Sequence, residues 1–159
     1  MDARSLEGAH KMSLQKKTAA NVKQAVPFFR VSNMEESLRY YIDGLGFEMT
    51  KKWIDEGKLR WCWLEIGEAA LMLQESRKEG HDSWNPSCKV GEGASIYFVC
   101  EDALAIYRDA ATQGIKVSRN PFVGNRMWVV PFADPDGYRI YFESRTDVPE
   151  ETEYSPQHH

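Results

Sequence analysis

Two halves of the chain repeat the same order of hydrophobic and polar positions. In the first half, an apolar stretch at residues 25–31 precedes Asn33, which lies three residues before Glu36 in the pattern of a helix capping box. Apolar side chains then recur at the spacing of an amphipathic helix as far as Leu45, and Gly46 follows as a helix-ending residue. Three stretches that favour strands complete this half, at residues 47–54, 59–66 and 69–75.

The second half begins with another extended apolar stretch, at residues 94–100. Asp102 follows as a helix cap, apolar residues recur at helical spacing, and Gly114 ends the helix. This repetition predicts a duplicated β-α-β-β-β unit and therefore an α+β fold. The strand-like stretches of the second unit lie near residues 115–119, 126–132 and 138–144.

A tight turn at residues 66–69 joins the last two strands of the first unit. A two-residue turn there pairs Trp63 with Met72 across the hairpin. It also pairs Trp61 with Gln74, so these four side chains share one face of the sheet. The other face is purely apolar and is expected to pack against the helix, with Cys62, Leu64, Leu71 and Leu73.

Alternation along the opening strand of each unit adds side chains to the same face. Phe28 and Arg30 share this face on the first strand, and Tyr97 takes it on the opening strand of the second unit. Trp53 has no assigned face, because the turn near residues 55–58 leaves room for a bulge in the strand before it.

The last hairpin of the second unit turns at residues 134–137. A four-residue turn there pairs Val130 with Tyr141. The same register pairs Trp128 with Glu143, which would add a further aromatic side chain and a carboxylate to the face.

Composition narrows the possible chemistry. The 159 residues are 42% hydrophobic and carry a net charge of −4, which argues against a strongly basic nucleic-acid binder. Three of the four histidines lie near the chain ends, so His81 is the only interior one. Mechanisms that need two histidines in a folded core are therefore excluded.

Cysteine usage and the absence of long apolar runs indicate the compartment. The three cysteines contain no C-x-x-C pair, which argues against a disulfide framework and a cysteine-rich zinc site. No stretch approaches the ~20 apolar residues of a membrane span. Neither does any apolar run follow the basic N-terminal residues as in a signal peptide. We expect a soluble cytoplasmic protein with a loose arm at residues 1–23 and a disordered tail at 147–159.

Two motifs in this duplicated framework resemble those of a known family. Gly44-Leu45-Gly46-Phe47-Glu48 follows the first helix, and Asp134-Pro135-Asp136-Gly137-Tyr138 precedes the last strand. Together with the duplication they resemble the vicinal oxygen chelate superfamily, which includes glyoxalase I, bleomycin-resistance proteins and extradiol dioxygenases. The resemblance implies tandem βαβββ modules, at residues 24–78 and 92–146 of a domain spanning 24–146. These would form a curved mixed sheet around a cup, with the helices on the outer face.

Metal-dependent members of this superfamily hold a divalent ion with four strand residues that point into the cup. The resemblance places those positions at Val26, Met72, Ser95 and Tyr141. Because these side chains make no oxygen and nitrogen set for such an ion, we expect neither a metal nor another cofactor. A displaced site built on Glu143, with Gln24 or Gln74, stays open as an alternative.

The side chains expected to line the cup are mainly aromatic and offer flat surfaces for a planar ligand. The resemblance also places Arg30 where glyoxalase I contacts a substrate carboxylate. Trp84, in the loop at 76–93, is a candidate lid or dimer contact. The predicted ligand-binding residues are Phe28, Arg30, Trp61, Trp63, Met72, Gln74, Tyr97, Trp128, Tyr141 and Glu143.

Three functions follow from this set. The first is a metal-free homodimeric protein that binds a small aromatic or hydrophobic molecule, in the manner of bleomycin-resistance proteins and without catalytic residues. The second is a metal-dependent glyoxalase-like lyase or dioxygenase with displaced ligands. The third is a module for dimerisation or partner binding.

Overall fold

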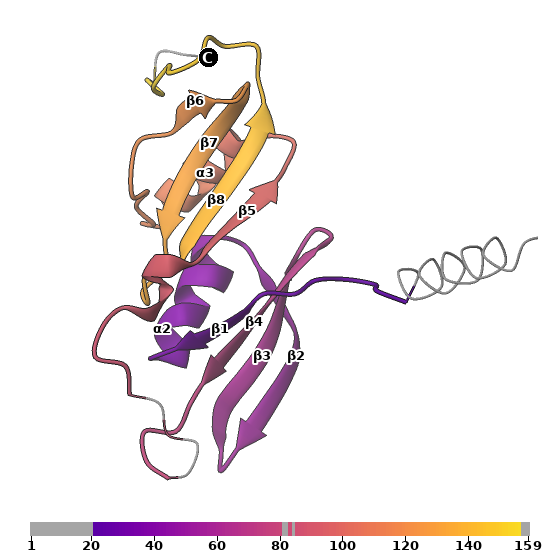
Figure 1. Cartoon of the computed structure of the whole chain (residues 1–159), viewed down its shortest axis with the longest axis vertical. Coiled ribbons are helices and arrows are strands. Elements are labelled where there is room, and N and C mark those ends of the chain that lie inside the picture. Colours follow the sequence, from indigo (N-terminus) through magenta and orange to yellow (C-terminus); the bar gives the residue numbers. More distant parts are fainter. Residues whose placement is uncertain (1–20, 81–82, 84, 157–159) are drawn as a thin grey trace, which may run out of the picture.

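The structure is a computed structural model of the chain, which describes residues 21–80, 83 and 85–156. Two βαβββ modules follow one another along the long axis of the molecule (Figure 1). The first contains β1 (Phe28–Val31), α2 (Met34–Leu38), the π-helical turn η1 (Arg39–Gly44), β2 (Glu48–Asp55), β3 (Lys58–Ile66) and β4 (Ala69–Glu75). The second contains the 3-10 turn η2 (Val90–Gly93), β5 (Ser95–Val99), α3 (Ala103–Thr112), β6 (Phe122–Gly124), β7 (Met127–Ala133) and β8 (Arg139–Arg145).

Each module forms its own four-stranded mixed sheet, which confirms the α+β class and the tandem modules. The strand orders are β1-β4-β3-β2 and β5-β8-β7-β6. In each sheet the opening strand runs parallel to the last strand and every other pair is antiparallel. None of the helices in the described residues is long and apolar enough to cross a membrane.

The helix boundaries follow the predicted capping residues. The Asn33 side chain accepts a hydrogen bond from the Glu36 backbone N–H at 3.2 Å. Asp102 accepts one from the Ala105 N–H at 2.9 Å at the start of α3. Each cap satisfies a backbone donor that has no partner within the first helical turn.

One strand of the second module differs from the prediction. Residues 115–119 form no strand, and β6 begins only after Pro121. Ser118 is still held to β7, because its N–H and hydroxyl both donate to the Pro131 carbonyl. The apolar alternation at 115–119 therefore packs this segment against the core without sheet pairing.

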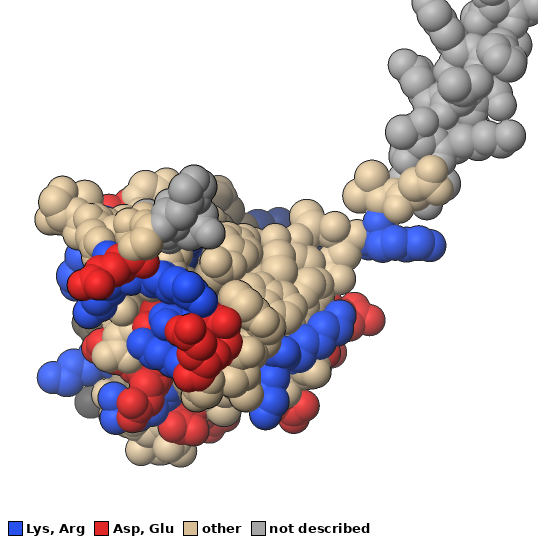
Figure 2. Space-filling model, turned by 90° about the horizontal axis from the view of Figure 1, so that it is seen from below, with Lys and Arg blue, Asp and Glu red and all other residues tan. Residues whose placement is uncertain are grey.

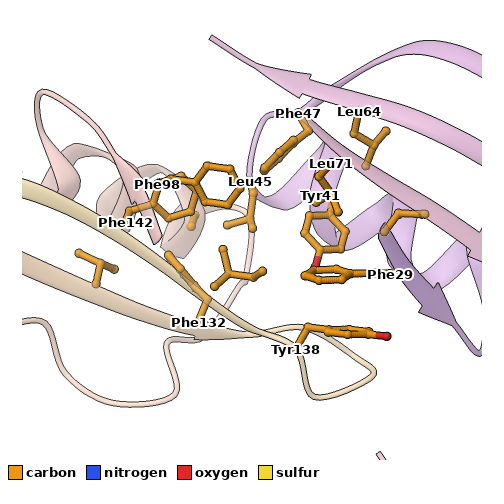
Figure 3. Close-up of a cluster of buried hydrophobic side chains, with 14 of the residues drawn as sticks. Phe29, Tyr41, Leu45, Phe47, Leu64, Leu71, Phe98, Phe132, Tyr138 and Phe142 are labelled. Carbon is orange, nitrogen blue, oxygen red and sulfur yellow. The ribbon is translucent and has the colours of Figure 1, made fainter. Parts of the chain in front are cut away.

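A single hydrophobic core runs through both modules (Figure 3). Cys62, Leu64, Leu71 and Leu73 are buried on the helix side of the first sheet, as predicted from the hairpin register. The core continues into the second module where the rings of Phe47 and Phe98 meet edge to face, with centroids 5.7 Å apart.

The turn between β7 and β8 connects the modules through its two aspartates. Asp134 is buried and accepts a hydrogen bond from the Tyr41 hydroxyl at 2.8 Å. Its other oxygen accepts from the N–H groups of Asp136 and Tyr138, both at 2.9 Å. The Asp136 carboxylate accepts from the Ser32 N–H of the first module. The turn motif therefore has a structural role at the module junction.

Aromatic packing strengthens the same junction. The Tyr138 ring stacks on Phe29 of β1, with centroids 3.8 Å apart and planes 10° from parallel (Figure 3). The Tyr138 hydroxyl also donates to the Arg30 carbonyl at 3.0 Å.

Residues 147–156, which belong to the predicted disordered tail, include a segment that contacts the second sheet. Thr152 and Val123 are joined by a backbone hydrogen bond of 2.9 Å, and Glu153 forms an isolated bridge with Phe122 at the edge of the second sheet. Tyr154 packs edge to face against Trp128. The acidic and proline-rich composition predicted disorder, but the edge of β6 supplies backbone partners and Trp128 supplies apolar surface. Residues 157–159 of the tail and residues 1–20 of the predicted arm at 1–23 lie outside the described part.

Candidate functional site

Each sheet packs one face on the core and leaves the other face open. On the first sheet Phe28 and Trp53 are 45% and 52% exposed, and on the second Tyr97 and Val99 are 55% and 75% exposed. Such fractions mean that no described segment of the chain covers either face. We call these surfaces the open face of the first sheet and the open face of the second sheet.

The predicted hairpin register places the aromatic side chains of the first module on its open face. Trp63 lies opposite Met72 and Trp61 opposite Gln74, as the two-residue turn requires. Phe28 of β1 pairs with Met72 from the other side. These side chains therefore lie side by side on β1, β4 and β3, which are neighbouring strands of the sheet. Arg30 joins them, since it pairs with Gln74.

Three residues of β2 and β3 that are not among the predicted site residues also lie on this face. Trp53 stands opposite Trp61, because the irregularity in β2–β3 pairing falls after it, between Trp53 and Ile54. The Lys51 ammonium lies 4.5 Å from the Trp63 ring centroid. Glu65 accepts a hydrogen bond from the Trp63 indole N–H at 2.7 Å. Two register shifts within β2 change which face its side chains take, so simple alternation along the strand could not place Lys51 and Trp53.

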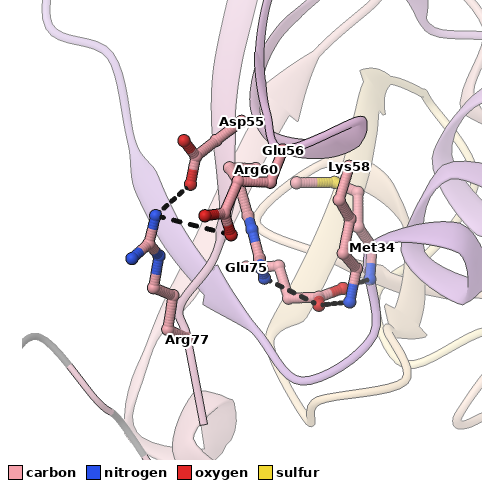
Figure 4. A network of polar contacts seen from close by, with 7 residues as sticks. All are labelled: Met34, Asp55, Glu56, Lys58, Arg60, Glu75 and Arg77. Carbon is pink, nitrogen blue, oxygen red and sulfur yellow. Dashed lines mark hydrogen bonds and ion pairs between the residues drawn. The ribbon is translucent and has the colours of Figure 1, made fainter. Parts of the chain in front are cut away.

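A charge network closes one end of the first sheet (Figure 4). Glu75 is buried and accepts a 2.7 Å hydrogen bond from the Met34 N–H at the start of α2. Lys58 and Arg60 form ion pairs with the same carboxylate. Burial alone would raise the pKa of Glu75, but the Lys58 and Met34 hydrogen bonds and the charges of Lys58 and Arg60 hold it below its ordinary value.

A second ion pair, between Arg77 and Asp55, lies beside this network. Figure 2 shows charged side chains of both signs interspersed on this end of the molecule, so that it presents no extended patch of a single sign. The network therefore fixes the ends of β3 and β4 and leaves little net charge to attract a ligand.

The open face of the second sheet carries a stacked tyrosine pair. Tyr97 and Tyr141 face each other across β5 and β8, with ring centroids 4.4 Å apart and planes 7° from parallel. Glu143 lies two residues further along β8, opposite Val99 and Val129. These three predicted site residues therefore share one face.

The predicted register of the last hairpin is wrong by one residue. Trp128 pairs with Ser144, and Tyr141 pairs with Pro131. Five residues, 134–138, separate the paired ends Ala133 and Arg139. Tyr138 belongs to the turn because its N–H binds Asp134 and its ring stacks in the module junction.

This shift moves Trp128 to the core face of the second sheet, where it is only 7% exposed. Its ring packs against Tyr154. A one-residue change of register sends every side chain of a strand to the opposite face, so Val129 and Pro131 take the positions expected for Trp128 and Val130.

The open face of the second sheet contains a shallow hollow of about 630 Å³. Tyr97 and Tyr141 line it from the sheet, and Phe122 lines it from β6. A smaller hollow of about 320 Å³ lies beside Trp53 and Gln74 at the end of the first sheet. Each open face therefore combines aromatic surface with a depression.

The four positions that hold a metal in related proteins do not fit a divalent ion here. Met72 and Tyr141 lie on the last strands of the two modules, Ser95 begins β5, and Val26 precedes β1. With Ser95 they offer one thioether and two hydroxyl groups, a poor donor set for a hard or borderline cation. In residues 21–80, 83 and 85–156 there is no group of three or more His, Cys, Asp or Glu side chains that could hold a metal ion.

The alternative of a displaced metal site built on Glu143 gains no support either. Glu143 belongs to the second sheet and Gln74 to the first, while Gln24 lies in the exposed segment before β1. His81 and Trp84 lie outside the described residues.

The sequence model of the Glyoxalase/Bleomycin resistance protein/Dioxygenase superfamily matches residues 22–142. No curated protein matches the chain by sequence. Among solved structures, a glyoxalase/bleomycin resistance protein from Catenulispora acidiphila DSM 44928 is similar with a TM-score of 0.59 and 21% identity, over 80% of this chain and 100% of that chain. TioX from Micromonospora sp. ML1 is similar with a TM-score of 0.61 and 12% identity, over 78% and 99% of the two chains.

A bleomycin-binding protein solved in complex with bleomycin is also similar, with a TM-score of 0.58 and 17% identity over 78% of this chain and 99% of that chain. At these identities the likeness concerns the fold. The matched sequence segment covers most of the chain and contains the first βαβββ module and the second as far as the middle of β8. The protein therefore belongs to the Glyoxalase/Bleomycin resistance protein/Dioxygenase superfamily.

Proposed function

We propose that this protein binds a planar aromatic or hydrophobic small molecule on its open faces, without a metal ion. The observation that carries the proposal is the set of aromatic side chains on the open face of the first sheet. Phe28, Trp53, Trp61 and Trp63 share it with Met72. Large apolar side chains on a surface that the chain itself does not cover are typical of binding sites.

The chemistry of this face suits stacking. Tryptophan and phenylalanine rings offer flat apolar area, and each aromatic pair adds about 0.5–1.5 kcal/mol beyond burial. Met72 supplies an adaptable side chain between Phe28 and Trp63. The Lys51 ammonium lies over the face of the Trp63 ring, and Glu65 accepts a hydrogen bond from its indole N–H. The orientation of the ring is therefore set before a ligand binds.

We further propose that a second copy of the chain completes the cup. The described part of one chain leaves both open faces uncovered, as the exposure of Trp53 and Tyr97 requires. In the proposed homodimer, the open face of the second sheet of one copy lies over the open face of the first sheet of the other. A ligand would then be enclosed between tryptophans on one side and the Tyr97–Tyr141 pair on the other.

The proposed homodimer predicts a specific response to a charge on the second sheet. Val99 is exposed on the open face of β5, so Val99→Glu should convert the dimer to monomer because it places a carboxylate in an apolar interface. Sedimentation velocity measures this directly. Asp109→Lys, on the exposed side of α3, is the matched control and should leave the dimer intact. A wild-type chain that sediments as a monomer at tens of micromolar would contradict the dimer.

Ligand binding is tested with N-phenyl-1-naphthylamine, a neutral probe whose fluorescence rises in apolar surroundings. We expect saturable binding, and Trp61→Leu should weaken it about 3- to 10-fold, the value of one lost aromatic contact. Trp128→Phe is the control, because Trp128 lies on the core face of the other sheet. Binding that is unchanged by Trp61→Leu would overturn the placement of the ligand, and absence of saturable binding would overturn the function.

A further inference from the structure

The hollow on the open face of the second sheet is lined by aromatic side chains beside small residues. Tyr97 and Tyr141 form a continuous stacked surface in neighbouring strands. Beside the tyrosine pair, few side-chain atoms rise into the hollow, because Pro131 is buried and Ala133 and Gly137 have little or no side chain. A planar ring can therefore reach the edge of the tyrosine pair without displacing a larger group.

Cationic side chains outnumber carboxylates around this hollow. Arg119, Arg139 and Lys89 line it, and Glu92 is the one acidic residue among its lining residues in the described chain. Arg119 is held in place, since its guanidinium lies 4.4 Å from the Phe122 ring centroid and pairs with Glu153 at 3.5 Å.

Arg139 is the cation best placed to meet a ligand. It lies two residues before Tyr141 on the same face of β8, so the two side chains leave the strand about 7 Å apart. Across β5, Arg139 is opposite Ser95, whose small side chain leaves space around it. A guanidinium binds a carboxylate through two parallel hydrogen bonds, and that geometry also fixes the ligand's orientation.

Around the tryptophans on the open face of the first sheet the excess of positive charge is smaller, and Arg30, which pairs with Gln74, supplies it. There Lys51 and Glu65 both contact Trp63 and balance each other. Discrimination between charged and neutral ligands should therefore come from the second sheet, while the first sheet supplies stacking area.

We propose that the hollow beside Tyr97 and Tyr141 is a subsite for planar aromatic anions, in which Arg139 binds the carboxylate of an aromatic acid and the tyrosine pair contacts its ring. The proposal rests on the function proposed above and narrows it from aromatic molecules in general to aryl carboxylates. Arg119 and Lys89 add long-range attraction, which salt screens.

Three probes of nearly equal shape test the charge preference by isothermal titration calorimetry: naphthalene-2-carboxylate, naphthalene-2-carboxamide and naphthalen-2-ylmethylamine. The carboxylate should bind at least fivefold more tightly than the amide, and the amine more weakly than either. The preference for the carboxylate should shrink as the salt concentration rises from 20 to 500 mM, about the range in which the screening length falls below 10 Å. Equal binding of carboxylate and amide would overturn the proposal.

Arg139→Gln locates the subsite. This variant should lose about 5- to 20-fold in affinity for the carboxylate and change the amide by less than twofold. Arg145→Gln is the matched control, because Arg145 lies on the same face of β8 six residues away, about 20 Å along the strand. An equal loss for both probes in Arg139→Gln, or the same loss in Arg145→Gln, would overturn the assignment.

The neutral fluorescent probe separates this proposal from the function on which it rests. If N-phenyl-1-naphthylamine binds more weakly to Trp61→Leu but the protein does not prefer the carboxylate to the amide, the proposed aromatic binding is supported and the anion subsite is contradicted. If none of the probes binds, both fall. Arg139 is exposed, so the variant is expected to keep the wild-type thermal unfolding midpoint, and that measurement accompanies each titration.

Discussion

Gly91→Ala is expected to lower the free energy of unfolding by about 4 kcal/mol or more, which only the most disruptive single substitutions do. A Cβ atom at residue 91 would lie 2.1 Å from the Tyr138 backbone nitrogen and 2.5 Å from its Cα. Both atoms belong to backbone, so a rotated side chain cannot relieve the clash. The turn that follows β7 would have to move.

Movement of that turn affects the module junction as a whole. The Gly91 N–H donates to the Asp136 carbonyl, and the same turn carries Asp134 and Tyr138 into contact with the first module. We therefore expect Gly91→Ala to lower the urea midpoint of the whole chain, followed by tryptophan fluorescence, and not to unfold one loop alone.

Gly93 provides the matched control within the same 3-10 turn. A Cβ at residue 93 would meet no atom within 4 Å, and its backbone lies outside the left-handed region. Gly93→Ala should be neutral or stabilising by up to about 1 kcal/mol, since alanine reduces the freedom of the unfolded chain. If the two variants have the same urea midpoint, the backbone contact between Gly91 and Tyr138 is not important for stability.

The second large effect concerns the pH dependence of the same junction. Burial raises the pKa of Asp134 from 3.8 to about 6, although the hydrogen bonds from Tyr41 and Tyr138 act in the opposite direction. Between these two values the folded protein binds more protons than the unfolded chain. Asp134 therefore makes the protein less stable as the pH rises from about 4 to about 6.

Asp134→Asn removes this titration and keeps most of the geometry. The asparagine oxygen can still accept from the N–H groups of Asp136 and Tyr138, as Asp134 Oδ1 does. The free energy of unfolding of the wild type should fall by about 2 kcal/mol relative to the variant between pH 4 and pH 7, since a pKa shift of one unit corresponds to about 1.4 kcal/mol and part of the effect lies below pH 4.

The comparison uses the difference between two unfolding curves, so other titrating groups cancel. Glu75 is the main one, because its pKa is lowered and the stability it contributes is lost as the pH falls below about 4.5. Urea unfolding of both proteins at half-unit pH intervals gives the difference directly. Parallel curves from pH 4 to pH 7 would show that Asp134 has an ordinary pKa.

Local sequence was enough to predict most of the fold. The caps at Asn33 and Asp102 depend on interactions within four residues, and their hydrogen bonds are those expected. The β3–β4 register follows from a two-residue turn, which leaves only one pairing, and every predicted pair of that hairpin is present. The duplication of these local patterns gave the two modules.

Predictions failed where a long-range contact decided a local structure. The hydrophobic pattern predicts that Tyr138 begins the last strand, but its contacts with Phe29 and the Arg30 carbonyl of the first module keep it in the turn. That single residue moved Trp128 from the open face to the core. Likewise, the backbone contacts that residues 151–153 make with the edge of β6 are not revealed by the composition of this segment.

The sequence by itself therefore determined the duplicated α+β architecture and the aromatic open face of the first sheet, because each depends on residue type and short-range periodicity. Only the tertiary structure decided the register of the last hairpin, the position of Trp53 beyond its bulge and the cationic hollow beside Tyr97 and Tyr141. Those features combine residues far apart in the chain, and their positions are set by packing between elements that no local pattern encodes.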